Sequence, residues 1–271
     1  MRVAVAGATG RTGRVVVARV LREADVALAA ALTAANDPQC GRPMPFGGCQ
    51  VSVTDRLEAP CDVLIDFTVP DGTMQWLAVC LDAAIPMVIA TTGHDERQRA
   101  RIRDASRTLP IVKAGNFSIG VAVLLRHVAQ VARVLGDDFD IEIVETHHRH
   151  KADAPSGTAL TLLDEIAAHT GRSPEHDAVF GRRGTTGPRP DRQIGVHAVR
   201  MGDVVGRHEV HFSGPGETLT LTHNAQSREP FAAGALRAAS WVVRRPPGLY
   251  TIADVLADAR TPDHPPTSRG P

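Results

Sequence analysis

The stretch Arg2-Val-Ala-Val-Ala-Gly-Ala-Thr-Gly-Arg-Thr-Gly13 decides the fold. It begins with a short apolar run that is typical of a buried parallel strand. Three glycines follow at intervals of three residues, and the next run, Arg14–Leu21, carries apolar residues at helical spacing. A strand, a Gly-rich turn and a helix in this order are the setting in which such a turn binds the pyrophosphate of a dinucleotide.

Each glycine of the turn has its own role in this prediction. Gly7 permits the turn, Gly10 lets the backbone approach a pyrophosphate, and Gly13 lets the helix pack on the sheet. A tight turn between a strand and a helix, without a ligand, is the alternative interpretation. We expect cofactor contacts along the whole turn, from Gly7, Ala8, Thr9, Gly10, Arg11, Thr12 and Gly13.

The chain then alternates strands with helices. Strands are expected at Val26–Leu32, Val63–Thr68, within Met87–Gly93, and at Ile111–Lys113. One helix is expected to end at Ala84 and another to span Asp95–Arg107, whereas the Gly- and Pro-rich residues 36–50 are expected to form a loop. This alternation predicts a Rossmann-like, doubly wound α/β domain.

Loops at the carboxyl ends of parallel strands line the ligand site of such a domain. We therefore expect further cofactor contacts from residues that directly follow the strands: Thr33, Ala90, Thr91, Thr92, Ala114, Gly115, Asn116 and Phe117. Many such domains place Asp or Glu at the end of the second strand, where it holds the ribose hydroxyls and repels the extra phosphate of NADPH. Here Thr33, Ala34 and Ala35 follow that strand, and the nearest acid is Asp37.

The end of the second strand thus shows neither an acid nor a cation that would choose between NADH and NADPH. Arg11, in the Gly-rich turn, is the nearest candidate cation, because a guanidinium binds phosphate in bidentate fashion. We expect the protein to use both cofactors, with kcat/KM values within about tenfold of each other.

The pattern changes after Leu135. A strand at Phe139–Glu145 and a helix at Gly157–Thr170 precede three strands with short Gly-containing turns: Ile194–Arg200, Val204–Phe212 and Thr218–His223. Consecutive strands of this kind predict a second, α+β domain with a mixed or antiparallel sheet. We place the first domain at 1–115, completed by 230–260, and the second at 116–229. The Pro-rich tail 261–271 is expected to be disordered.

Titratable side chains are concentrated in Glu145-Thr-His-His-Arg-His-Lys-Ala-Asp-Ala-Pro-Ser-Gly-Thr158, where the second domain passes from a strand into a helix. Imidazole and ammonium groups supply protons and bind anions, and the N–H groups at a helix start also bind anions. The stretch predicts a pocket for a carboxylate-bearing substrate that receives a proton. A metal site and a solvated basic loop are the alternatives, although the spacing of His147, His148 and His150 is poor for ligands on one helix face.

The lysine in this stretch favours chemistry over a solvated loop. The chain has 30 Lys plus Arg, and of these only Lys113 and Lys151 are lysines. Lys can release a proton near neutral pH in a suitable site, whereas Arg cannot. We infer that Lys151 is present for a purpose that Arg serves poorly.

Residues 145–159, read as Glu-x-His-His-x-x-Lys-x-Asp-Ala-Pro-Ser-Gly-Thr-Ala, resemble the signature of the dihydrodipicolinate reductase (4-hydroxy-tetrahydrodipicolinate reductase) family. The resemblance extends from Val3 to about Val255. It implies reduction of 4-hydroxy-tetrahydrodipicolinate, a cyclic dicarboxylate, by NADPH or NADH in diaminopimelate and lysine biosynthesis. It also implies a homotetramer assembled through the sheet of the second domain.

The resemblance implies a role for each residue of the cluster. His147 and Lys151 would act as general acids that deliver the proton. The substrate carboxylate would be held by His148, Lys151, Gly157 and Thr158. From the residues themselves, Ser156 is expected to cap the helix, and Asp153 is expected to stabilise the turn before Pro155.

Composition narrows the choice of partners and compartment. The formal net charge is zero, which argues against nucleic acid and anionic membranes as partners. We find no apolar stretch of membrane-spanning length, and only Met1 and Arg2 precede the first apolar run, so we expect no signal peptide. The four cysteines form no Cys-x-x-Cys pair and are expected to be free thiols of a cytoplasmic protein, with a Cys40–Cys49 disulfide as the alternative.

Two other classes of protein share parts of this pattern. One is a non-catalytic dinucleotide sensor whose first turn reads Gly-Ala-Thr-Gly-x-x-Gly, but such a protein does not require the cluster at 145–158. The other is a different NAD(P)-dependent oxidoreductase on the same scaffold, such as an aldehyde or amino-acid dehydrogenase. Those enzymes call for a different catalytic set, for example a nucleophilic Cys after a strand, and no cysteine lies in the second domain.

Overall fold

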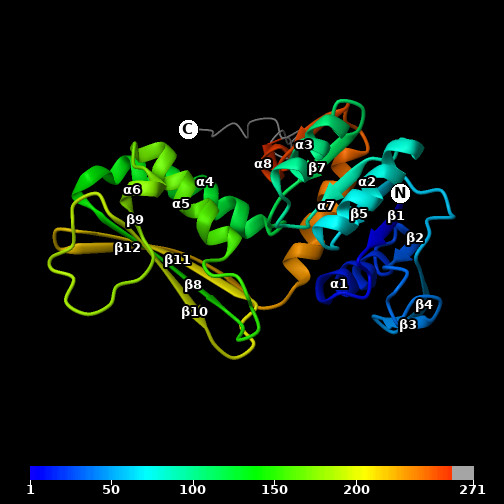
Figure 1. Cartoon of the computed structure of the whole chain (residues 1–271), viewed down its shortest axis with the longest axis horizontal. Coiled ribbons are helices and arrows are strands. Elements are labelled where there is room, and N and C mark those ends of the chain that lie inside the picture. Colours follow the sequence, from blue (N-terminus) through cyan, green and yellow to red (C-terminus); the bar gives the residue numbers. More distant parts are fainter. Residues whose placement is uncertain (258–271) are drawn as a thin grey trace, which may run out of the picture. The chain divides into compact units, whose positions relative to one another are not determined.

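The computed structural model describes residues 1–257, and the tail expected at 261–271 lies outside them. By its contacts the chain divides into two compact units. One is discontinuous and contains Met1–Ala114 and the chain from Ala232 onward, and the other contains Gly115–Phe231 (Figure 1). Each unit has its own sheet and its own core, as described separately below.

The first unit is built on a sheet of eight strands in the order β13-β7-β6-β5-β1-β2-β4-β3. The strands are β1 (Arg2–Ala6), β2 (Ala27–Leu32), β3 (Pro43–Phe46), β4 (Cys49–Thr54), β5 (Val63–Asp66), β6 (Met87–Ile89), β7 (Pro110–Lys113) and β13 (Gly248–Tyr250). All neighbours run parallel except β3 and β4. The helices are α1 (Arg11–Val20), α2 (Pro70–Ala83), α3 (Glu96–Ala105), α7 (Glu229–Val242), which begins just before this unit, and α8 (Ile252–Ala257).

The strand order places a topological switch at β1. The chain passes through α1 to β2 on one side of β1, and later returns to β5 on the other side. In such a sheet the ligand crevice lies outside the carboxyl ends of the strands at the switch. The predicted doubly wound, parallel-rich domain is confirmed.

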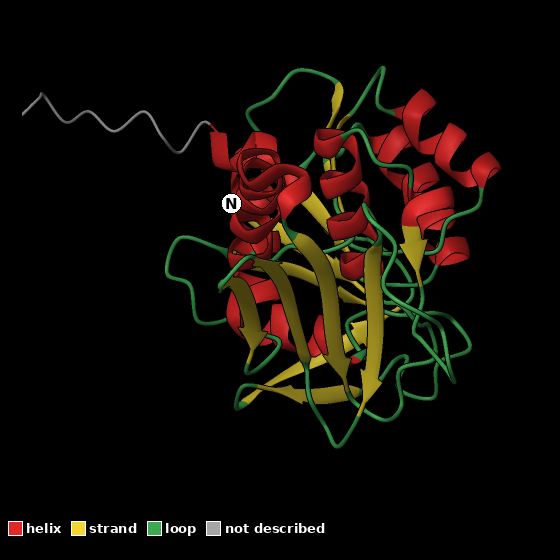
Figure 2. Cartoon of the chain, turned by 90° about the vertical axis from the view of Figure 1, so that its left-hand side faces the viewer, coloured by secondary structure: helices red, strands yellow, loops and turns green. Residues whose placement is uncertain are grey.

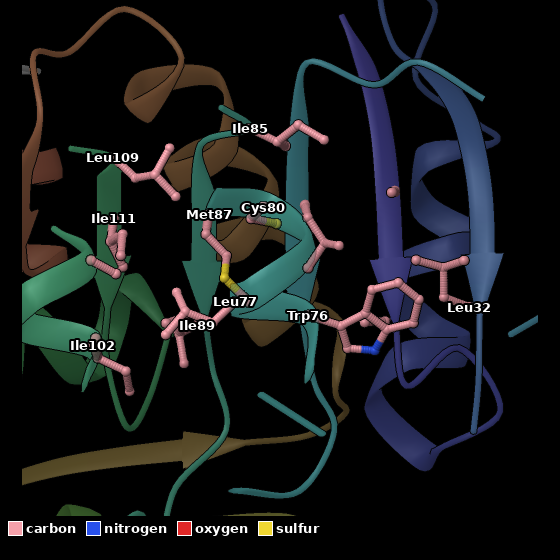
Figure 3. Close-up of a cluster of buried hydrophobic side chains, with 14 residues drawn as sticks. Leu32, Trp76, Leu77, Cys80, Ile85, Met87, Ile89, Ile102, Leu109 and Ile111 are labelled. Carbon is pink, nitrogen blue, oxygen red and sulfur yellow. The ribbon is translucent and has the colours of Figure 1, made fainter. Parts of the chain in front are cut away.

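The strands of this unit are apolar because the sheet is buried. Figure 3 shows Trp76, Leu77 and Cys80 of α2 in one buried cluster with Met87 and Ile89 of β6. A fully buried side chain of this size contributes about 1.5–3 kcal/mol relative to an exposed one. The cluster therefore fixes the strand ends that carry the loops of the site.

The prediction of a loop over residues 36–50 holds for 36–42 but is wrong from Pro43 onward. β3 and β4 form an antiparallel hairpin there, turning at Gly47 and Gly48, whose φ values are 55° and 94°. Met44 and Phe46 alternate with two prolines and are buried. Because β3 is the edge strand, the N–H groups that proline lacks are not needed by a further neighbour. The prolines argued against a strand in the sequence, although the alternation of apolar Met44 and Phe46 with prolines is a strand pattern.

The second unit contains a mixed sheet of five strands in the order β12-β11-β8-β10-β9 (Figure 2). Its strands are β8 (Asp140–His147), β9 (Ala178–Val179), β10 (Ile194–Arg200), β11 (Gly206–Gly214) and β12 (Glu217–Ala225). β8 pairs parallel with β10 and antiparallel with β11. The helical elements are α4 (Ile119–Leu135), the short η1 (Gly136–Asp138), α5 (Gly157–Thr170) and α6 (Pro174–Asp177). The predicted mixed α+β sheet is confirmed.

One face of this sheet packs on α4 and α5. Their apolar side chains join Ile141 and Ile143 of β8 and Phe212 of β11 in a single buried cluster. Alternate residues of β8, β11 and β12 point away from this cluster and stay partly or fully exposed. The alternation along β8 is that of a strand with one buried and one open face.

The expectation that no apolar stretch reaches membrane-spanning length is wrong. Residues Ile119–Asp138, which cover α4 and η1, are long and apolar enough for a membrane span by length and composition alone. In the structure the buried residues of α4 are part of the cluster that covers the sheet. Packing against the sheet accounts for the apolar character of that face of the helix.

Candidate active site

The Gly-rich turn between β1 and α1 has the geometry of a dinucleotide cradle. Gly7 has a φ of 79°, and a Cβ there would clash with the backbone oxygen of Phe67, directly after β5. A Cβ on Gly13 would clash with the Gly7 oxygen, so the helix packs against the turn itself. Gly10 is the N-cap of α1 and provides no side-chain cap, which leaves first-turn N–H groups for an anion. The residues present therefore fit a pyrophosphate.

Asp37, the acid nearest to the end of β2 in the sequence, is hydrogen bonded to that strand end. The chain turns after Thr33, and the Asp37 Oδ2 accepts hydrogen bonds from Thr33 Oγ1 at 2.6 Å and from Thr9 Oγ1 at 2.7 Å. The sequence offered Asp37 as the nearest acid to this strand end, and the turn brings its carboxylate back to Thr33. Hydrogen bonds from Thr33 and Thr9 lower the pKa of Asp37, so the carboxylate is ionised at neutral pH.

The other predicted cofactor residues follow β6 and β7. Ala90, Thr91 and Thr92 directly follow β6, and the hydroxyl of Thr91 is buried without a hydrogen-bond partner among the described residues. Ala114 closes the first segment of the first unit, whereas Gly115, Asn116 and Phe117 belong to the second unit. A buried, unpartnered hydroxyl at the carboxyl edge of the sheet is consistent with a missing ligand group.

His94, which no sequence signal marks as a site residue, follows these residues in the chain. It is buried, and neither ring nitrogen has a hydrogen-bond partner among the described residues. Burial and the charge of Lys113 lower the pKa of His94. Burial, followed by the charge of Arg99, lowers the pKa of Lys113. A single His after Thr91-Thr92-Gly93 gave no signal of this environment in the sequence.

In the second unit the carboxyl end of β8 carries the first groups of the predicted catalytic cluster. His147 is the last residue of β8, and its Nδ1 lies 2.5 Å from the Oε2 of Glu145. The two side chains lie on one face of the strand because they are two residues apart. The side chain of Glu145 is fully buried, so its charge requires partners.

Arg200 supplies the compensating charge. It ends β10, in register with His147, and its Nη1 and Nη2 donate to the two carboxylate oxygens of Glu145 at 2.9 and 2.8 Å. The backbone N–H of Ser156 donates to the Glu145 Oε1 at 3.0 Å. Burial would raise the pKa of Glu145, but hydrogen bonds from His147 and Arg200 lower it to about 2. An ionised carboxylate only accepts, so the Nδ1 of His147 carries the hydrogen.

The second nitrogen of His147, Nε2, makes no hydrogen bond to another described residue. A Cβ on Gly206, the first residue of β11, would lie 3.1 Å from this nitrogen, so glycine keeps the approach clear. The ring of His208 meets the ring of His147 edge-on, with centroids 5.2 Å apart. Burial and the nearby His147 lower the pKa of His208 to about 3, so His208 is neutral. The Nε2 of His147 is thus the free end of an oriented imidazole.

Lys151 lies in the turn after β8. Its Nζ donates to the two carboxylate oxygens of Asp153 at 2.8 and 2.9 Å. The Asp153 side chain, expected to stabilise the turn before Pro155, pairs with Lys151 within that turn. The side chain of Asp153 is 61% exposed, and an ion pair this open exchanges readily with water or another anion.

The start of α5 lies beside these groups because Glu145 binds the backbone of its N-cap, Ser156. The Ser156 side chain accepts a hydrogen bond from the Ala159 N–H, as expected of a cap, and also contacts His208 Nε2 at 3.2 Å. A Cβ on Gly157 would meet nothing within 4 Å, so the space before the helix start is open. The N–H groups of Gly157 and Thr158 are first-turn groups without intrahelical acceptors.

Two further predicted residues, Asn116 and His148, also belong to the second unit. Asn116, expected to contact the cofactor, donates through Nδ2 to the Thr158 Oγ1 at 3.2 Å. His148 is partly exposed, with its ring 6.3 Å from that of His150. Across residues 1–257, no group of three or more His, Cys, Asp or Glu side chains has the arrangement of a metal site.

Comparison with known proteins identifies the family. Family models described as the N-terminus and the C-terminus of dihydrodipicolinate reductase match residues 1–117 and 120–256. The chain belongs to the dihydrodipicolinate reductase family. The resemblance inferred from the cluster at 145–159 is thereby confirmed, and a non-catalytic dinucleotide sensor is not favoured.

Individual relatives agree with this membership. The chain is 48% identical to 4-hydroxy-tetrahydrodipicolinate reductase of Thiobacillus denitrificans, over 94% of this chain and 98% of that protein. It is 44% identical to the protein of the same name from Acinetobacter baumannii, over 94% of this chain and 96% of that protein.

Solved structures show the same fold. A dipicolinate-bound dihydrodipicolinate reductase from Paenisporosarcina sp. TG-14 aligns with a TM-score of 0.72 and 26% identity, over 93% of this chain and 97% of that one. Aspartate semialdehyde dehydrogenase II of Vibrio cholerae aligns with a TM-score of 0.54 and 14% identity, over 90% of this chain and 98% of that one. The second likeness concerns the scaffold alone.

Proposed function

We propose that this protein reduces 4-hydroxy-tetrahydrodipicolinate to tetrahydrodipicolinate with NADPH or NADH, in diaminopimelate and lysine biosynthesis. The single observation that carries the proposal is the oriented imidazole of His147, held by buried Glu145 in the same unit as the open helix start at Gly157. A proton donor beside an anion-binding helix start suits a carboxylate substrate that is reduced.

The reaction replaces the hydroxyl of the substrate by hydrogen, so one hydride and one proton are taken up and one water is released. The reduced nicotinamide cofactor, when bound to the first unit, supplies the hydride. His147 would deliver the proton from Nε2, while the carboxylate of Glu145 fixes the Nδ1–H and stabilises the charged ring. Lys151 would serve as the second donor once a substrate carboxylate displaces Asp153 from its ammonium.

Substrate binding is assigned to the residues around the start of α5. The backbone N–H groups of Gly157 and Thr158 would hold one carboxylate, as helix N-termini do. His148 and Lys151 would add positive charge from the turn after β8. The Thr158 hydroxyl, already hydrogen bonded to Asn116, would orient toward the same anion.

The experiment is a reduction assay with purified protein. Oxidation of NADPH or NADH, followed by absorbance, is expected only when freshly generated hydroxy-tetrahydrodipicolinate is present. Aspartate semialdehyde and diaminopimelate serve as controls for other dehydrogenase activities on this scaffold. Turnover with a control substrate and none with hydroxy-tetrahydrodipicolinate would replace the proposal by another oxidoreductase.

We also propose that the protein is a cytoplasmic homotetramer. The open face of the five-stranded sheet supports assembly, since it carries an exposed apolar side chain in Val199 of β10. The four free thiols Cys40, Cys49, Cys61 and Cys80 suit a reducing compartment. Light scattering at micromolar concentration is expected to give four times the mass of the chain, and a monomer mass would contradict the tetramer.

A further inference from the structure

Arg200, the last residue of β10, uses all four terminal N–H groups of its guanidinium. Nη1 donates to Glu145 Oε2 at 2.9 Å and to the Val199 oxygen at 2.7 Å. Nη2 donates to Glu145 Oε1 at 2.8 Å and to the backbone oxygen of Asp153 at 2.6 Å. The two bonds to Glu145 neutralise a buried acid, whereas the bond to Asp153 reaches the turn that carries Lys151.

The Glu145 carboxylate connects Arg200 to two further parts of the site. Its Oε2 lies 2.5 Å from the Nδ1 of His147, and its Oε1 accepts from the N–H of Ser156, the N-cap of α5, at 3.0 Å. The Glu145 side chain is fully buried, so its position depends on the groups that pair with it. Arg200 is therefore linked to the His147 ring, to the start of α5 and to the turn after β8.

The bond to Asp153 anchors the later part of that turn. Its earlier part is held by backbone bonds from the Arg149 N–H to the Gly202 oxygen and from the Lys151 N–H to the His148 oxygen, each at 3.1 Å. Asp153 is exposed, and its backbone oxygen accepts a charge-assisted hydrogen bond, which is stronger than one between neutral groups.

We propose that Arg200 is a positioning residue for the reduction, whose guanidinium fixes the turn that carries Lys151 relative to the Glu145–His147 pair, so that both proton donors meet one substrate. The inference rests on the proposed function, because it concerns the two donors of that reaction. A lysine at this position keeps the charge but has one nitrogen in place of a fork, so it cannot hold the carboxylate and the turn in the same way.

A double-mutant cycle in the reductase assay tests the proposal. Arg200→Lys is expected to lower kcat about tenfold, because small displacements of catalytic groups are costly. Fixing two donors relative to each other matters only while both are present, so the same change in Lys151→Ala protein should lower kcat by about twofold or less. Tenfold losses in both backgrounds would show that Arg200 does not act through the donors, and would overturn the proposal.

Arg207→Lys is the matched control for this cycle. Arg207 also lies on a strand of the second unit and pairs with a glutamate, Glu209, but its side chain is 50% exposed. The change keeps the charge there as well and should leave kcat unchanged.

A second change leaves the Arg200 side chain intact. Replacing Ala154 by lactic acid turns the Asp153–Ala154 amide into an ester, whose carbonyl oxygen is a weaker hydrogen-bond acceptor. Glu145 keeps its cation, so the protein should fold even if Arg200→Lys does not. Weakening this one hydrogen bond is expected to lower kcat about threefold, and unchanged kinetics would contradict the proposal.

Lysine reactivity provides a measurement that does not need the reductase reaction. Lys113 and Lys151 are the only lysines of the chain, so their acetylation by acetic anhydride can be followed separately by peptide mass spectrometry. Lys113 lies in the first unit and serves as the internal reference. A loosened turn in Arg200→Lys should speed the acetylation of Lys151 about threefold or more relative to Lys113. An unchanged ratio would mean that Arg200 does not hold the turn.

The two measurements distinguish this inference from the proposed function. If hydroxy-tetrahydrodipicolinate is not reduced while the acetylation ratio changes as expected, Arg200 fixes the turn and the proposed function fails. If reduction is normal while the cycle shows no coupling and the ratio is unchanged, the proposed function stands and Arg200 serves only to neutralise Glu145.

Discussion

Glu145 and Asp37 are both carboxylates with three hydrogen-bonding residues each, but they lie in opposite environments. Glu145 is fully buried and is neutralised by Arg200, with His147 and the Ser156 N–H as its other partners. Asp37 is partly exposed and is held by the hydroxyls of Thr9 and Thr33 and by one backbone N–H. The pKa of each carboxylate is lowered. In Glu145 the hydrogen bonds overcome a large opposing effect of burial, whereas in Asp37 the effect of burial is the smallest of the causes.

This difference separates two uses of an acid. A buried carboxylate with a cationic partner has no capacity left for a ligand, so Glu145 positions another group and holds its unit together. An exposed carboxylate with neutral partners keeps its charge available at the surface, so Asp37 acts on what binds there. Removing a partner should therefore be costly at the first site and nearly harmless to folding at the second.

The largest effect is expected from Arg200→Met. It leaves the Glu145 carboxylate buried without its cation, and breaking a buried pair in this way costs about 3–5 kcal/mol of unfolding free energy. Urea unfolding measures the loss. Arg207→Met, which breaks an ion pair whose arginine side chain is 50% exposed, is the control, at about 0–1 kcal/mol. Equal losses in the two variants would remove the distinction between buried and exposed acids.

Proton delivery gives the next largest effect. His147→Ala and Lys151→Ala should each lower kcat by about 10²-fold or more, the usual scale of general acid catalysis. His150→Ala, in the same cluster but exposed, is the control and should retain most of its activity. Steady-state kinetics at saturating substrate decide the question. Near-normal turnover in both variants would refute the assignment of the donors.

The buried cluster should also make stability depend on pH. His208 has a pKa of about 3 in the folded protein against an ordinary 6.5, so the unfolded chain binds more protons between these values. Stability is therefore complete above pH 6.5 and falls as the pH drops toward 3, by up to about 1.4 kcal/mol per pH unit from this group. Glu145 adds a second loss between 4.5 and about 2.

Urea unfolding between pH 8 and 3 tests this dependence. His208→Gln keeps an amide that can bond to Ser156 but does not titrate, so its stability should be flatter between pH 6.5 and 4.5 than that of the wild type. A wild-type curve that is already flat in this interval would mean that His208 is not buried as a neutral ring.

A smaller effect is expected on substrate affinity. His148→Ala should raise KM by about tenfold with little change in kcat, because His148 is assigned to a carboxylate contact that is present in the ground state. Thr158→Val is the weaker companion, since its backbone N–H remains. An unchanged KM in His148→Ala, together with loss of a bound metal in elemental analysis, would show that the cluster is a metal site.

The smallest effect is expected from Asp37→Ala on folding. Water can replace its hydrogen bonds to the threonine hydroxyls, so the unfolding free energy should change by about 1 kcal/mol or less. Urea unfolding with and without NADH provides the measurement. A loss as large as that of Arg200→Met would show that Asp37 is a structural residue, and the comparison with Glu145 would fail.

Much of the site could be predicted because its signals are local. The Gly-rich turn gives its spacing directly, and the structure gives Gly7 and Gly13 the close contacts that exclude a side chain. Ser156 was predicted as a cap from its place before an apolar helix, and the structure shows the capping bond. Such features depend on a few consecutive residues, whose geometry the backbone itself restricts.

The features that the sequence did not reveal depend on contacts between distant segments. β3 was concealed by its prolines, which only its position at the sheet edge makes tolerable. Arg200 lies 55 residues from Glu145 in the chain, and only the pairing of β10 with β8 brings the two together. Asp37 was visible as the nearest acid, but the turn that returns it to Thr33 was not.

By itself the sequence determined the two kinds of sheet, the family and the identity of the proton-bearing cluster, because periodicity, glycine spacing and a long motif are properties of neighbouring residues. Only the tertiary structure decided which charges are neutralised and which remain available. Arg200 became the partner of Glu145 through the register of β10 on β8. Burial and pairing set the pKa of a group, and both arise from segments that are distant in the chain.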